Sequence, residues 1–369
     1  MNSCKIAVVG ATGAVGQVFL DIADQRHFPI DEIRLCASER SVGKKIEFRS
    51  QEIEVELCTP AVLDEVDFAF ISASGDVSRE VAPLAANRGT VAIDDSSAFR
   101  MDADVPLVVP EVNANALDEF FQDENRTNII SNPNCSTIQM VVALKPLHDE
   151  AIINRVVIST YQSVSGAGQK AMDELFNQTK DIYSNKKIEK NKFTKQISFN
   201  AIPHIGSFLE NGNTEEEQKM IDETKKIIDK GIKISATCVR IPVFIGHSES
   251  INIEFDSYLS EERAKELLEK FENVSVIDYR KDEGYVTPVE IAGEDKVFIS
   301  RIRKDEGYIT PVEIAGEDKV YVSRIRNDDS IDNGLSIWVV SDNLRKGAAL
   351  NAVQIAELLI SDYAEKILI

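Results

Sequence analysis

The chain has 369 residues, of which 43% are hydrophobic and 28% are charged, and its formal net charge at pH 7 is -21. This length is enough for two domains of ordinary size, each with its own core, and the composition is that of a folded globular protein. The negative charge, without any run of Lys and Arg, disfavours nucleic acid and membrane surfaces as partners. We therefore expect neither nucleic acid nor a membrane as a partner.

The chain enters a strand-like run directly after Met1 to Lys5, so we expect no signal peptide, and no apolar stretch approaches the roughly 20 residues that span a bilayer. The five cysteines, at positions 4, 36, 58, 135 and 238, are scattered, which predicts reduced thiols and a cytoplasmic protein. No pair of Cys or His residues has the close spacing of a zinc site, so we expect no metal.

The first part of the chain alternates short apolar strands with helical patterns. A strand from Lys5 to Val9 is followed by Gly10-Ala11-Thr12-Gly13-Ala14-Val15-Gly16 and by a helix through Ala23. Further buried strands are predicted over 33–37, 68–73 and 90–93, with a helix over 77–87. This βαβ order predicts a parallel sheet with right-handed crossovers over about the first 130 residues, as in a Rossmann-type dinucleotide-binding domain.

From Arg155 the predicted strands alternate more openly, which favours a mixed, largely antiparallel sheet in a second, α+β domain. The expected strands cover 155–161, 233–241, 250–255 and 335–340, and the expected helices cover 170–183, 215–229, 260–271 and 343–360. The fold class predicted for the whole chain is therefore α/β, with an N-terminal Rossmann-type domain followed by this α+β domain.

A 23-residue segment occurs twice in tandem, at 280–302 and 303–325, and the copies differ only by conservative changes at three positions. The duplication leaves two nearly equivalent strands, 296–303 and 319–326, for one place in a sheet. We predict that the second copy holds this place, because it can pair with 335–340 through a short connection, and that the first copy is a surface excursion.

The glycine turn at positions 10 to 16 is a candidate phosphate-binding turn. Its spacing is Gly-x-x-Gly-x-x-Gly, but it follows a strand and opens a helix, where the backbone can approach a pyrophosphate. The alternative is a tight turn without a ligand. At the end of the second strand, Ser38-Glu39-Arg40-Ser41 offers an acid for a ribose 2′-hydroxyl and an arginine for a 2′-phosphate. We predict NADP, with a solvated turn as the alternative.

The strongest local signal is Asn132-Pro133-Asn134-Cys135-Ser136-Thr137, followed by an apolar helical run over 138–144 that Pro146 is predicted to close. Cys135 then stands at a helix start, where free amides and the macrodipole favour a nucleophilic thiolate and can hold an oxyanion. The alternative is a small buried residue. The polar neighbours and the helix start favour the nucleophile.

A thiolate that attacks a carbonyl needs a proton partner, and the chain has four histidines, at positions 27, 148, 204 and 247. His247 lies in Arg240-Ile241-Pro242-Val243-Phe244-Ile245-Gly246-His247, between two strands, where a glycine lets the backbone turn. The other three have no catalytic residue type close by in the sequence. We therefore predict His247 as the acid or base, with a hydrogen-bonded loop histidine as the alternative.

The chain resembles the aspartate-semialdehyde dehydrogenase family through motifs that occur in order along nearly its whole length. These are the glycine turn, Asn-Pro-Asn-Cys-Ser-Thr, Ser163-Val164-Ser165-Gly166-Ala167-Gly168, Arg240-x-Pro-Val-x-x-Gly-His, and Asp342-Asn343-Leu344-Arg345-Lys346-Gly347-Ala348-Ala349. The duplicated unit departs from the family. The resemblance implies an NADP-binding domain over 1–133 completed by 343–369, and a catalytic and dimerisation domain over 134–342 in a homodimer or homotetramer.

By this resemblance the enzyme reduces L-aspartyl 4-phosphate to L-aspartate 4-semialdehyde with NADPH, releases phosphate, and serves lysine, threonine, methionine and diaminopimelate biosynthesis. Cys135 would form a thioester, His247 would return a proton, and Gln162 would position the carbonyl. Arg240 would bind the α-carboxylate and Glu216 the α-amino group. The phosphate would be bound by Arg100, Asn134 and Lys219. The cofactor would be bound by Gly10, Thr12, Gly13, Ala14, Val15, Gly16, Ser38, Arg40, Ser41, Ser165, Gly166, Asn343 and Gln354.

Three alternatives remain at this stage. The helix that carries Glu216 and Lys219 is polar nearly all round, so both residues can also belong to a solvated charged face. A related acyl-phosphate reductase of the N-acetylglutamyl-phosphate type would share the cysteine chemistry, but its acetamide would leave the Glu216 carboxylate without a matching charge. A non-catalytic dinucleotide-binding homologue is the third alternative.

Overall fold

The computed structural model describes residues 3–64, 66–278, 285–291 and 318–367. The chain divides into two compact units, Met1–Asn134 with Ala348–Ile369, and Cys135–Gly347. The sequence predicted the divisions at 133/134 and 342/343. Within the described residues, no helix has both the length and the apolar composition needed to cross a membrane.

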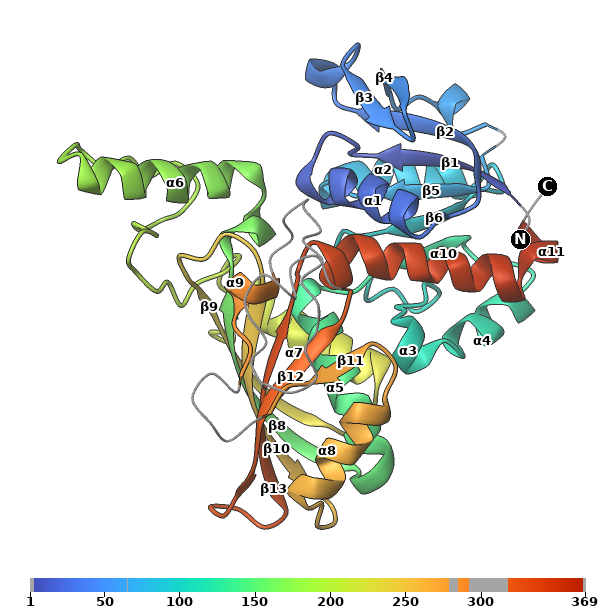
Figure 1. Cartoon of the computed structure of the whole chain (residues 1–369). Coiled ribbons are helices and arrows are strands. Elements are labelled where there is room, and N and C mark those ends of the chain that lie inside the picture. The colour runs from blue at the N-terminus through green and yellow to red at the C-terminus, as the bar shows by residue number, and fades with distance from the viewer. Residues whose placement is uncertain (1–2, 65, 279–284, 292–317, 368–369) are drawn as a thin grey trace, which may run out of the picture. The chain divides into compact units, whose positions relative to one another are not determined.

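The first unit is built on a seven-stranded sheet with the order β3-β4-β2-β1-β5-β6-β7 (Figure 1). The strands are β1 (Cys4–Val9), β2 (Ile30–Ala37), β3 (Lys45–Phe48), β4 (Gln51–Leu57), β5 (Phe68–Ile71), β6 (Val91–Asp94) and β7 (Ile129–Ser131). All neighbours pair in parallel except β3 and β4, which form an antiparallel hairpin at one edge. The predicted parallel sheet is thus confirmed, and the hairpin is an addition that the prediction lacked.

Helices cover this sheet and supply much of its core. They are α1 (Ala14–Gln25), α2 (Gly75–Ala86), α3 (Pro110–Asn113), α4 (Ala116–Gln122), α10 (Leu350–Asp362) and α11 (Ala364–Ile367). Phe19 of α1 packs against Phe70 of β5, and Val353 and Leu359 of α10 belong to the same buried cluster. Burial of such side chains, at about 1.5–3 kcal/mol each, ties the C-terminal helix to α1 and α3.

The predicted start of the last helix was wrong. Asp342 Oδ1 accepts hydrogen bonds from the backbone N–H groups of Leu344 and Arg345, at 2.9 Å and 3.1 Å. A π-helical turn, Arg345–Ala349, follows, and the α-helix begins only at Leu350. Helical periodicity does not distinguish such a turn from the first turn of an α-helix.

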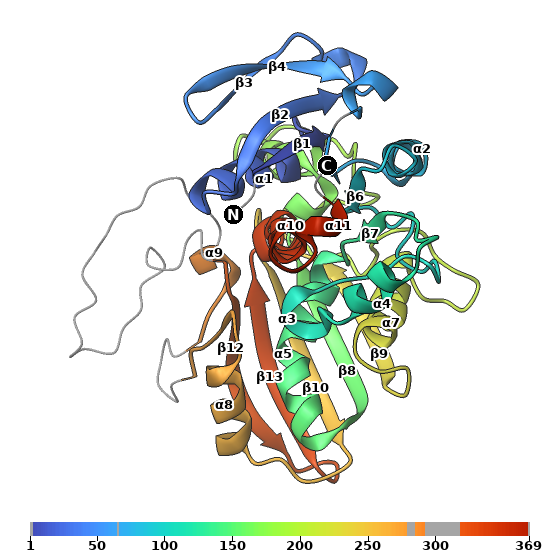
Figure 2. The same cartoon turned by 90° about the vertical axis from the view of Figure 1, so that its right-hand side faces the viewer.

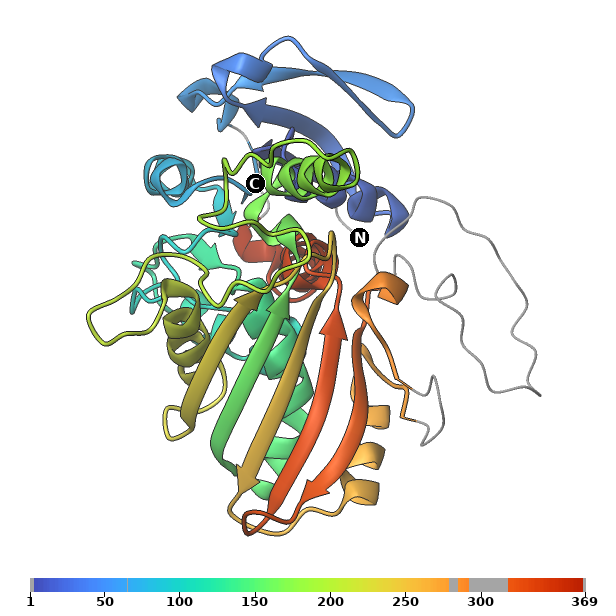
Figure 3. The same cartoon turned by 90° about the vertical axis from the view of Figure 1, so that its left-hand side faces the viewer.

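The second unit is built on a mixed six-stranded sheet with the order β11-β12-β13-β10-β8-β9 (Figure 3). The strands are β8 (Ile153–Gln162), β9 (Lys233–Arg240), β10 (His247–Phe255), β11 (Val274–Val276), β12 (Val320–Asp328) and β13 (Gly334–Ser341). The central strand β10 is antiparallel to both β8 and β13, and β9 is parallel to β8. The predicted mixed, largely antiparallel sheet is confirmed.

Three helices of the second unit, α5 (Cys135–Ala151), α7 (Glu215–Ile227) and α8 (Glu261–Lys270), lie on one face of this sheet (Figures 2 and 3). Helix α5 is buried along nearly its whole length, and it continues through Pro146 instead of ending there. The prediction of an end at Pro146 was therefore wrong. Burial of Leu144, Leu147 and Ala151 on both sides of the proline outweighs a cost of about 3 kcal/mol for the interrupted helix.

The duplicated segment contributes to the second unit from both copies. The second copy supplies β12, which pairs with β13, as predicted. The first copy supplies helix α9 (Pro288–Ile291), whose Ile291 packs with Val286, Tyr321 and Val340, so the prediction of a surface excursion is wrong for these residues. Trp338 Nε1 also donates to the Val286 carbonyl oxygen at 3.0 Å. The strand predicted at 296–303 lies outside the described residues.

Candidate active site

Cys135 is the first residue of α5, and its side chain is partly exposed. The other four cysteines are not at helix starts, and three of them are buried. A Cβ added to Gly347 would lie 3.0 Å from Cys135 Cβ, so any larger residue at position 347 would crowd the Cys135 side chain. Cys135 therefore lies at a helix start, as predicted, and its partial exposure is a second feature of reactive thiols.

A row of polar side chains crosses the second unit's sheet on the face that carries α5. Gln162 and Arg240 are paired neighbours at the ends of β8 and β9. The pairing of Ser248 with Tyr161 brings His247 level with Gln162 at the start of β10. All three side chains are buried, with exposed fractions of 1%, 5% and 0% for Gln162, Arg240 and His247. The sheet register thus brings together three predicted site residues that are far apart in the sequence.

The ring of His247 is held through its Nδ1 atom. The backbone N–H of Ser163 donates to Nδ1 at 3.2 Å, and the Ser163 hydroxyl lies 3.0 Å from the same atom. Because a backbone amide can only donate, Nδ1 is the acceptor and the proton of the neutral ring is on Nε2. Nε2 is buried and has no hydrogen-bond partner in the described part of the chain. It is available to a substrate as a donor.

Burial and the charge of Arg240 lower the pKa of His247 to about 3, although the Glu216 carboxylate opposes this shift. The ring is therefore neutral at neutral pH. Asn343 supports this arrangement, because its Oδ1 accepts from the hydroxyls of Ser163 and Ser165 and from the backbone N–H of Gly246. Sequence reasoning did not identify Ser163 as a site residue, although it opens one of the quoted motifs.

Arg240 interacts electrostatically with Cys135 and with the Glu216 carboxylate. Its Nη1 donates to the Ser163 carbonyl oxygen at 2.6 Å. Burial lowers the pKa of Arg240, while the negative charges of Glu216 and Cys135 oppose that shift. The cation is thus within electrostatic range of both anionic groups.

Helix α7 delivers Glu216 to this row by means of a capping box. The Thr214 hydroxyl accepts from the Glu217 backbone N–H at 3.4 Å, and the Glu217 carboxylate accepts from the Thr214 N–H at 2.7 Å. Glu216 is 7% exposed and accepts from Gln162 Nε2 at 3.2 Å and from Lys219 Nζ at 3.3 Å. Glu216 therefore does not belong to a solvated face, whereas Lys219 is half-buried.

The first unit holds the other predicted residues. Arg100 is buried, and its guanidinium donates to the carbonyl oxygens of Asn132 and Asp95, at 2.9 Å and 2.7 Å. Asn134 is buried and directly precedes Cys135 in the chain. Gln354 of α10 donates to Glu111 at 2.9 Å. Arg100 and Gln354 thus each donate hydrogen bonds to other residues of the first unit.

The turn between β1 and α1 fits a dinucleotide phosphate. Gly10 has φ +90°, and a Cβ there would lie 2.2 Å from the Ser72 carbonyl oxygen. A Cβ at position 16 would lie 2.4 Å from the Gly10 carbonyl oxygen, so this position also excludes any residue larger than glycine. Gly13 is the N-cap of α1 and has no side chain with which to cap the first-turn amides. On the other side of the turn, Thr12 and Ser41 hydroxyls are 3.4 Å apart, in the segment that contains Ser38 and Arg40.

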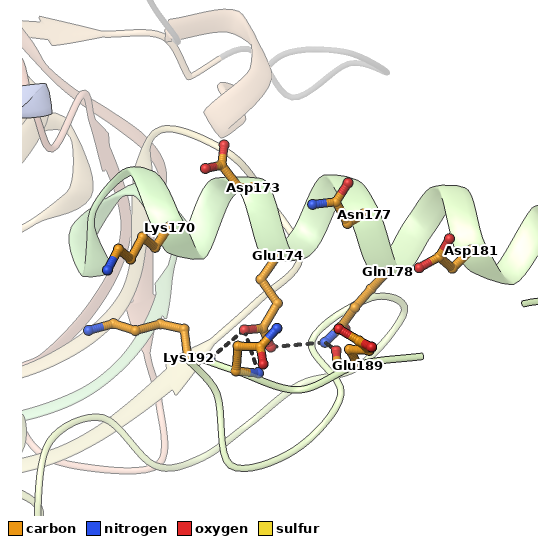
Figure 4. A pocket seen from close by; sticks show the side chains of 9 residues that line it. Lys170, Asp173, Glu174, Asn177, Gln178, Asp181, Glu189 and Lys192 are labelled. Atoms are coloured by element: carbon orange, nitrogen blue, oxygen red, sulfur yellow. Dashed lines mark hydrogen bonds between the residues drawn. The ribbon is translucent and has the colours of Figure 1, made fainter. Parts of the chain in front are cut away.

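A cavity of about 650 Å³ lies elsewhere in the second unit, along α6 (Gln169–Tyr183) (Figure 4). The buried Glu174 carboxylate within it accepts from the backbone N–H groups of Asn191 and Lys192 and from Gln178. None of the predicted site residues lines it. The lining residues are Lys170, Asp173, Glu174, Asn177, Gln178, Asp181, Glu189, Asn191 and Lys192.

Comparison with known protein families identifies the class of this chain as semialdehyde dehydrogenase. The family model for the NAD binding domain of semialdehyde dehydrogenases matches residues 5–120. The model for their dimerisation domain matches residues 144–308 and 306–346. The two segments of the second match meet inside the second copy of the repeat.

Individual relatives narrow this class. Aspartate-semialdehyde dehydrogenase of Aquifex aeolicus is 51% identical over 97% of this chain and 98% of its own length. The crystal structure of aspartate semialdehyde dehydrogenase II of Vibrio cholerae complexed with ASA has a TM-score of 0.87 at 44% identity, covering 98% of this chain and 100% of that one. The enzyme of Candida albicans with NADP has a TM-score of 0.71 at 26% identity, with full coverage of both chains. The chain belongs to the aspartate-semialdehyde dehydrogenase family.

Proposed function

We propose that the chain reduces L-aspartyl 4-phosphate to L-aspartate 4-semialdehyde, with release of phosphate, using NADPH and a covalent thioester on Cys135. The observation that carries this proposal is the meeting of Arg240, Glu216, Gln162 and His247 beside the start of α5. A buried cation next to a buried carboxylate matches the α-carboxylate and α-ammonium groups of an amino-acid substrate.

The Cys135 sulfur attacks the acyl carbon, a C–S bond forms, and the bond from that carbon to the phosphate oxygen breaks, so phosphate leaves with the electron pair. The start of α5, with the positive end of its helix dipole, stabilises the oxyanion that develops. Arg100, Asn134 and Lys219 bind the phosphate group in this proposal, and Gln162 orients the carbonyl.

When bound, the nicotinamide supplies the hydride that reduces the thioester carbon. His247 holds a proton on Nε2, because Nδ1 accepts from the Ser163 N–H. It donates a hydrogen bond from Nε2–H to the oxyanion of the reacting carbon. As the thiohemiacetal collapses, the shared proton returns to Nε2, the C=O bond re-forms, the C–S bond breaks, and the Cys135 sulfur leaves as a thiolate. A neutral imidazole is suited to this role, because an imidazolium would be costly in this buried site.

The cofactor is NADP in this proposal, bound at Gly10, Thr12, Gly13, Ala14, Val15 and Gly16, with Ser38, Arg40 and Ser41 at the 2′-phosphate. Ser165, Gly166, Asn343 and Gln354 complete the site. The crystal structure of the Candida albicans enzyme with NADP supports this choice. Arg40→Gln should lower kcat/KM for NADP more than for NAD; an unchanged ratio of the two would exclude Arg40 as the determinant.

The two compact units are proposed to act as an NADP-binding domain and a catalytic and dimerisation domain, in a homodimer or homotetramer. The match to a dimerisation domain supports the formation of a homo-oligomer. Analytical ultracentrifugation at several protein concentrations would determine the number of subunits. The five free cysteines suit a reducing compartment such as the cytoplasm.

Reduction of NADP with aspartate semialdehyde and phosphate tests the proposed function directly. Wild type should turn over, Cys135→Ala should not, and the variant should still bind NADP. N-acetylglutamate semialdehyde should be a poor substrate, because its acetamide would leave the Glu216 carboxylate without a matching charge. A preference for that aldehyde would overturn the assignment.

A further inference from the structure

A second row of polar side chains lies directly behind the catalytic row of the second unit. Glu249 is two residues after His247 on β10, so both side chains are on the same face of the strand. Glu249 pairs with Thr160 of β8, and Thr160 pairs with Cys238 of β9. The catalytic row His247, Gln162 and Arg240 is thus followed, one layer deeper, by Glu249, Thr160 and Cys238.

Helix α5 makes the same step between the two layers. Gln139 is four residues, or one helical turn, after Cys135, so the two side chains are on the same side of the helix. The Gln139 amide is close enough to the Glu249 carboxyl to favour its ionised form. The nucleophile and the catalytic histidine therefore belong to elements that meet again, one layer deeper, through Gln139 and Glu249.

In the part of the chain that the structure describes, these two buried side chains have no partner other than each other. Glu249 and Gln139 are both 0% exposed. Both oxygens of Glu249 and both polar atoms of Gln139 lack a well-aligned hydrogen bond in the described part of the chain. A buried polar group without a hydrogen bond costs about 1–3 kcal/mol. A hydrogen-bonding arrangement in which the Glu249 carboxyl and the Gln139 amide satisfy each other is therefore favoured.

We propose that Glu249 is a positioning residue that stays protonated and forms a reciprocal acid–amide pair with Gln139, bracing the start of α5 against β10 and so fixing Cys135 relative to His247. The acid O–H donates to Gln139 Oε1, and Gln139 Nε2 donates to the acid carbonyl oxygen. This inference rests on the proposed roles of Cys135 and His247.

The surroundings of Glu249 agree with a neutral acid. Burial raises the pKa of Glu249 well above its ordinary value. The ionisable groups on the neighbouring elements are His247 on its own strand, the Cys238 thiol on β9, and Glu216 and Glu217 of α7, whose negative charges help to raise the pKa of Cys238. On β13 the paired residue is Val339, which has no charge.

Loss of the proton would break the brace. A carboxylate cannot donate to Gln139 Oε1, so one of the two hydrogen bonds disappears. It would also bring a negative charge into the layer below an anionic nucleophile, which disfavours the thiolate. Wild type should therefore lose activity on the alkaline side as Glu249 ionises.

The test compares Glu249→Leu, Gln139→Leu, the double variant and the conservative Glu249→Gln, which can still form two reciprocal amide hydrogen bonds with Gln139. Glu254→Leu, on the opposite face of β10 and half-exposed, is the matched control. Each variant is assayed for kcat and KM with aspartate semialdehyde, phosphate and NADP, for the rate of Cys135 alkylation, and for Tm.

Both single Leu variants should lower kcat about tenfold or more with little change in KM. The reason is that a shift of Cys135 relative to His247 impairs the chemical step more than it impairs substrate binding. They should also slow alkylation, and the double variant should be no worse than either single one. Glu249→Gln should keep kcat within about threefold and lose the alkaline decline seen in wild type.

Two results would overturn the proposal. One is a lowered Tm in the Leu variants with unchanged kcat per folded enzyme and unchanged alkylation. The other is an alkaline limb that is identical in wild type and Glu249→Gln. If wild type has no turnover with the semialdehyde, the proposed function fails instead, and the alkylation rates still test the brace.

Discussion

The most specific prediction concerns Gly166, which lies in the 3₁₀ turn Val164–Ala167. A Cβ at this position would lie 3.1 Å from Arg240 Nη1 and 3.2 Å from His247 Nε2. Both distances are tighter than most real Cβ contacts, so Gly166→Ala requires its neighbours to move by a few tenths of an ångström. The added methyl group would also lie against Nε2 of His247, which has no hydrogen-bond partner in the described part of the chain.

Neither neighbour can move freely. Arg240 is held by its 2.6 Å hydrogen bond to the Ser163 carbonyl oxygen, and His247 is held at Nδ1 by the Ser163 N–H. A displacement of about 1 Å in an active site costs about a hundredfold in rate, so a few tenths of an ångström should cost about tenfold in kcat. The fold should tolerate the change, with Tm within about 4 °C of wild type.

The assay is steady-state turnover with aspartate semialdehyde, phosphate and NADP, together with thermal unfolding. Gly75→Ala in α2 is the matched control, because its Cβ would meet Arg79 Nη2 only at an ordinary 3.8 Å. Unchanged kcat and KM in Gly166→Ala would refute the reasoning. A large drop in Tm would refute it as well, because glycine at position 166 would then be required for the stability of the fold.

Three further predictions follow from the same structure. Folded His247 stays neutral down to pH about 3, whereas an unfolded histidine titrates near 6.5, so the unfolded state takes up the proton first and stability is lost as pH falls between these values. Urea unfolding should show that the free energy of unfolding falls between pH 7 and pH 5 by about 2 kcal/mol less in His247→Gln than in wild type. An equal fall in both proteins would show that His247 is not the cause. An alkylating reagent should label Cys135, and phosphate should lower the rate of this labelling. The reagent should also label the partly exposed Cys58, whose pKa is lowered by Cys36, at a rate that phosphate does not affect. Buried Cys4, whose pKa is raised to about 12, should stay unlabelled, and equal labelling of all five cysteines would count against a catalytic thiol. Deletion of residues 292–314 joins α9 of the first copy to β12 of the second and should leave folding and turnover intact; loss of either would show that the extra unit is required.

The sequence predicted the elements whose pattern is set by burial on all sides or on one face. Strand β1 is apolar and buried apart from Lys5, and the βαβ order of the first unit follows from such strands. The edge hairpin β3–β4 was missed, because its Lys and Glu residues alternate with few apolar ones, as exposed edge strands do. Pro146 was given too much weight, because local sequence does not show how much burial a helix gains beyond a proline.

The candidate site was predictable where a local motif carries the chemistry. Cys135 and His247 stand in such motifs, and Arg240 and Glu216 came from the resemblance. What the sequence could not show is the contact between elements: the Ser163 N–H that sets the tautomer of His247, and the pairing of Glu249 with Gln139. Both depend on strand register and on helix packing across more than 80 residues of chain. The burial of Glu216, on a helix that is polar nearly all round, depends on packing in the same way.

The central claim is that the Cys135 sulfur carries the acyl group. The most direct measurement is to mix the enzyme with aspartate semialdehyde and NADP without phosphate and to quench the reaction with acid. The masses of the intact protein and of its peptides are then determined by mass spectrometry. The account predicts one aspartyl acyl group on Cys135, matched by a burst of about one NADPH per active site, and its release on addition of phosphate. Reduced cofactor without any adduct, or turnover in Cys135→Ala near the wild-type rate, would contradict it.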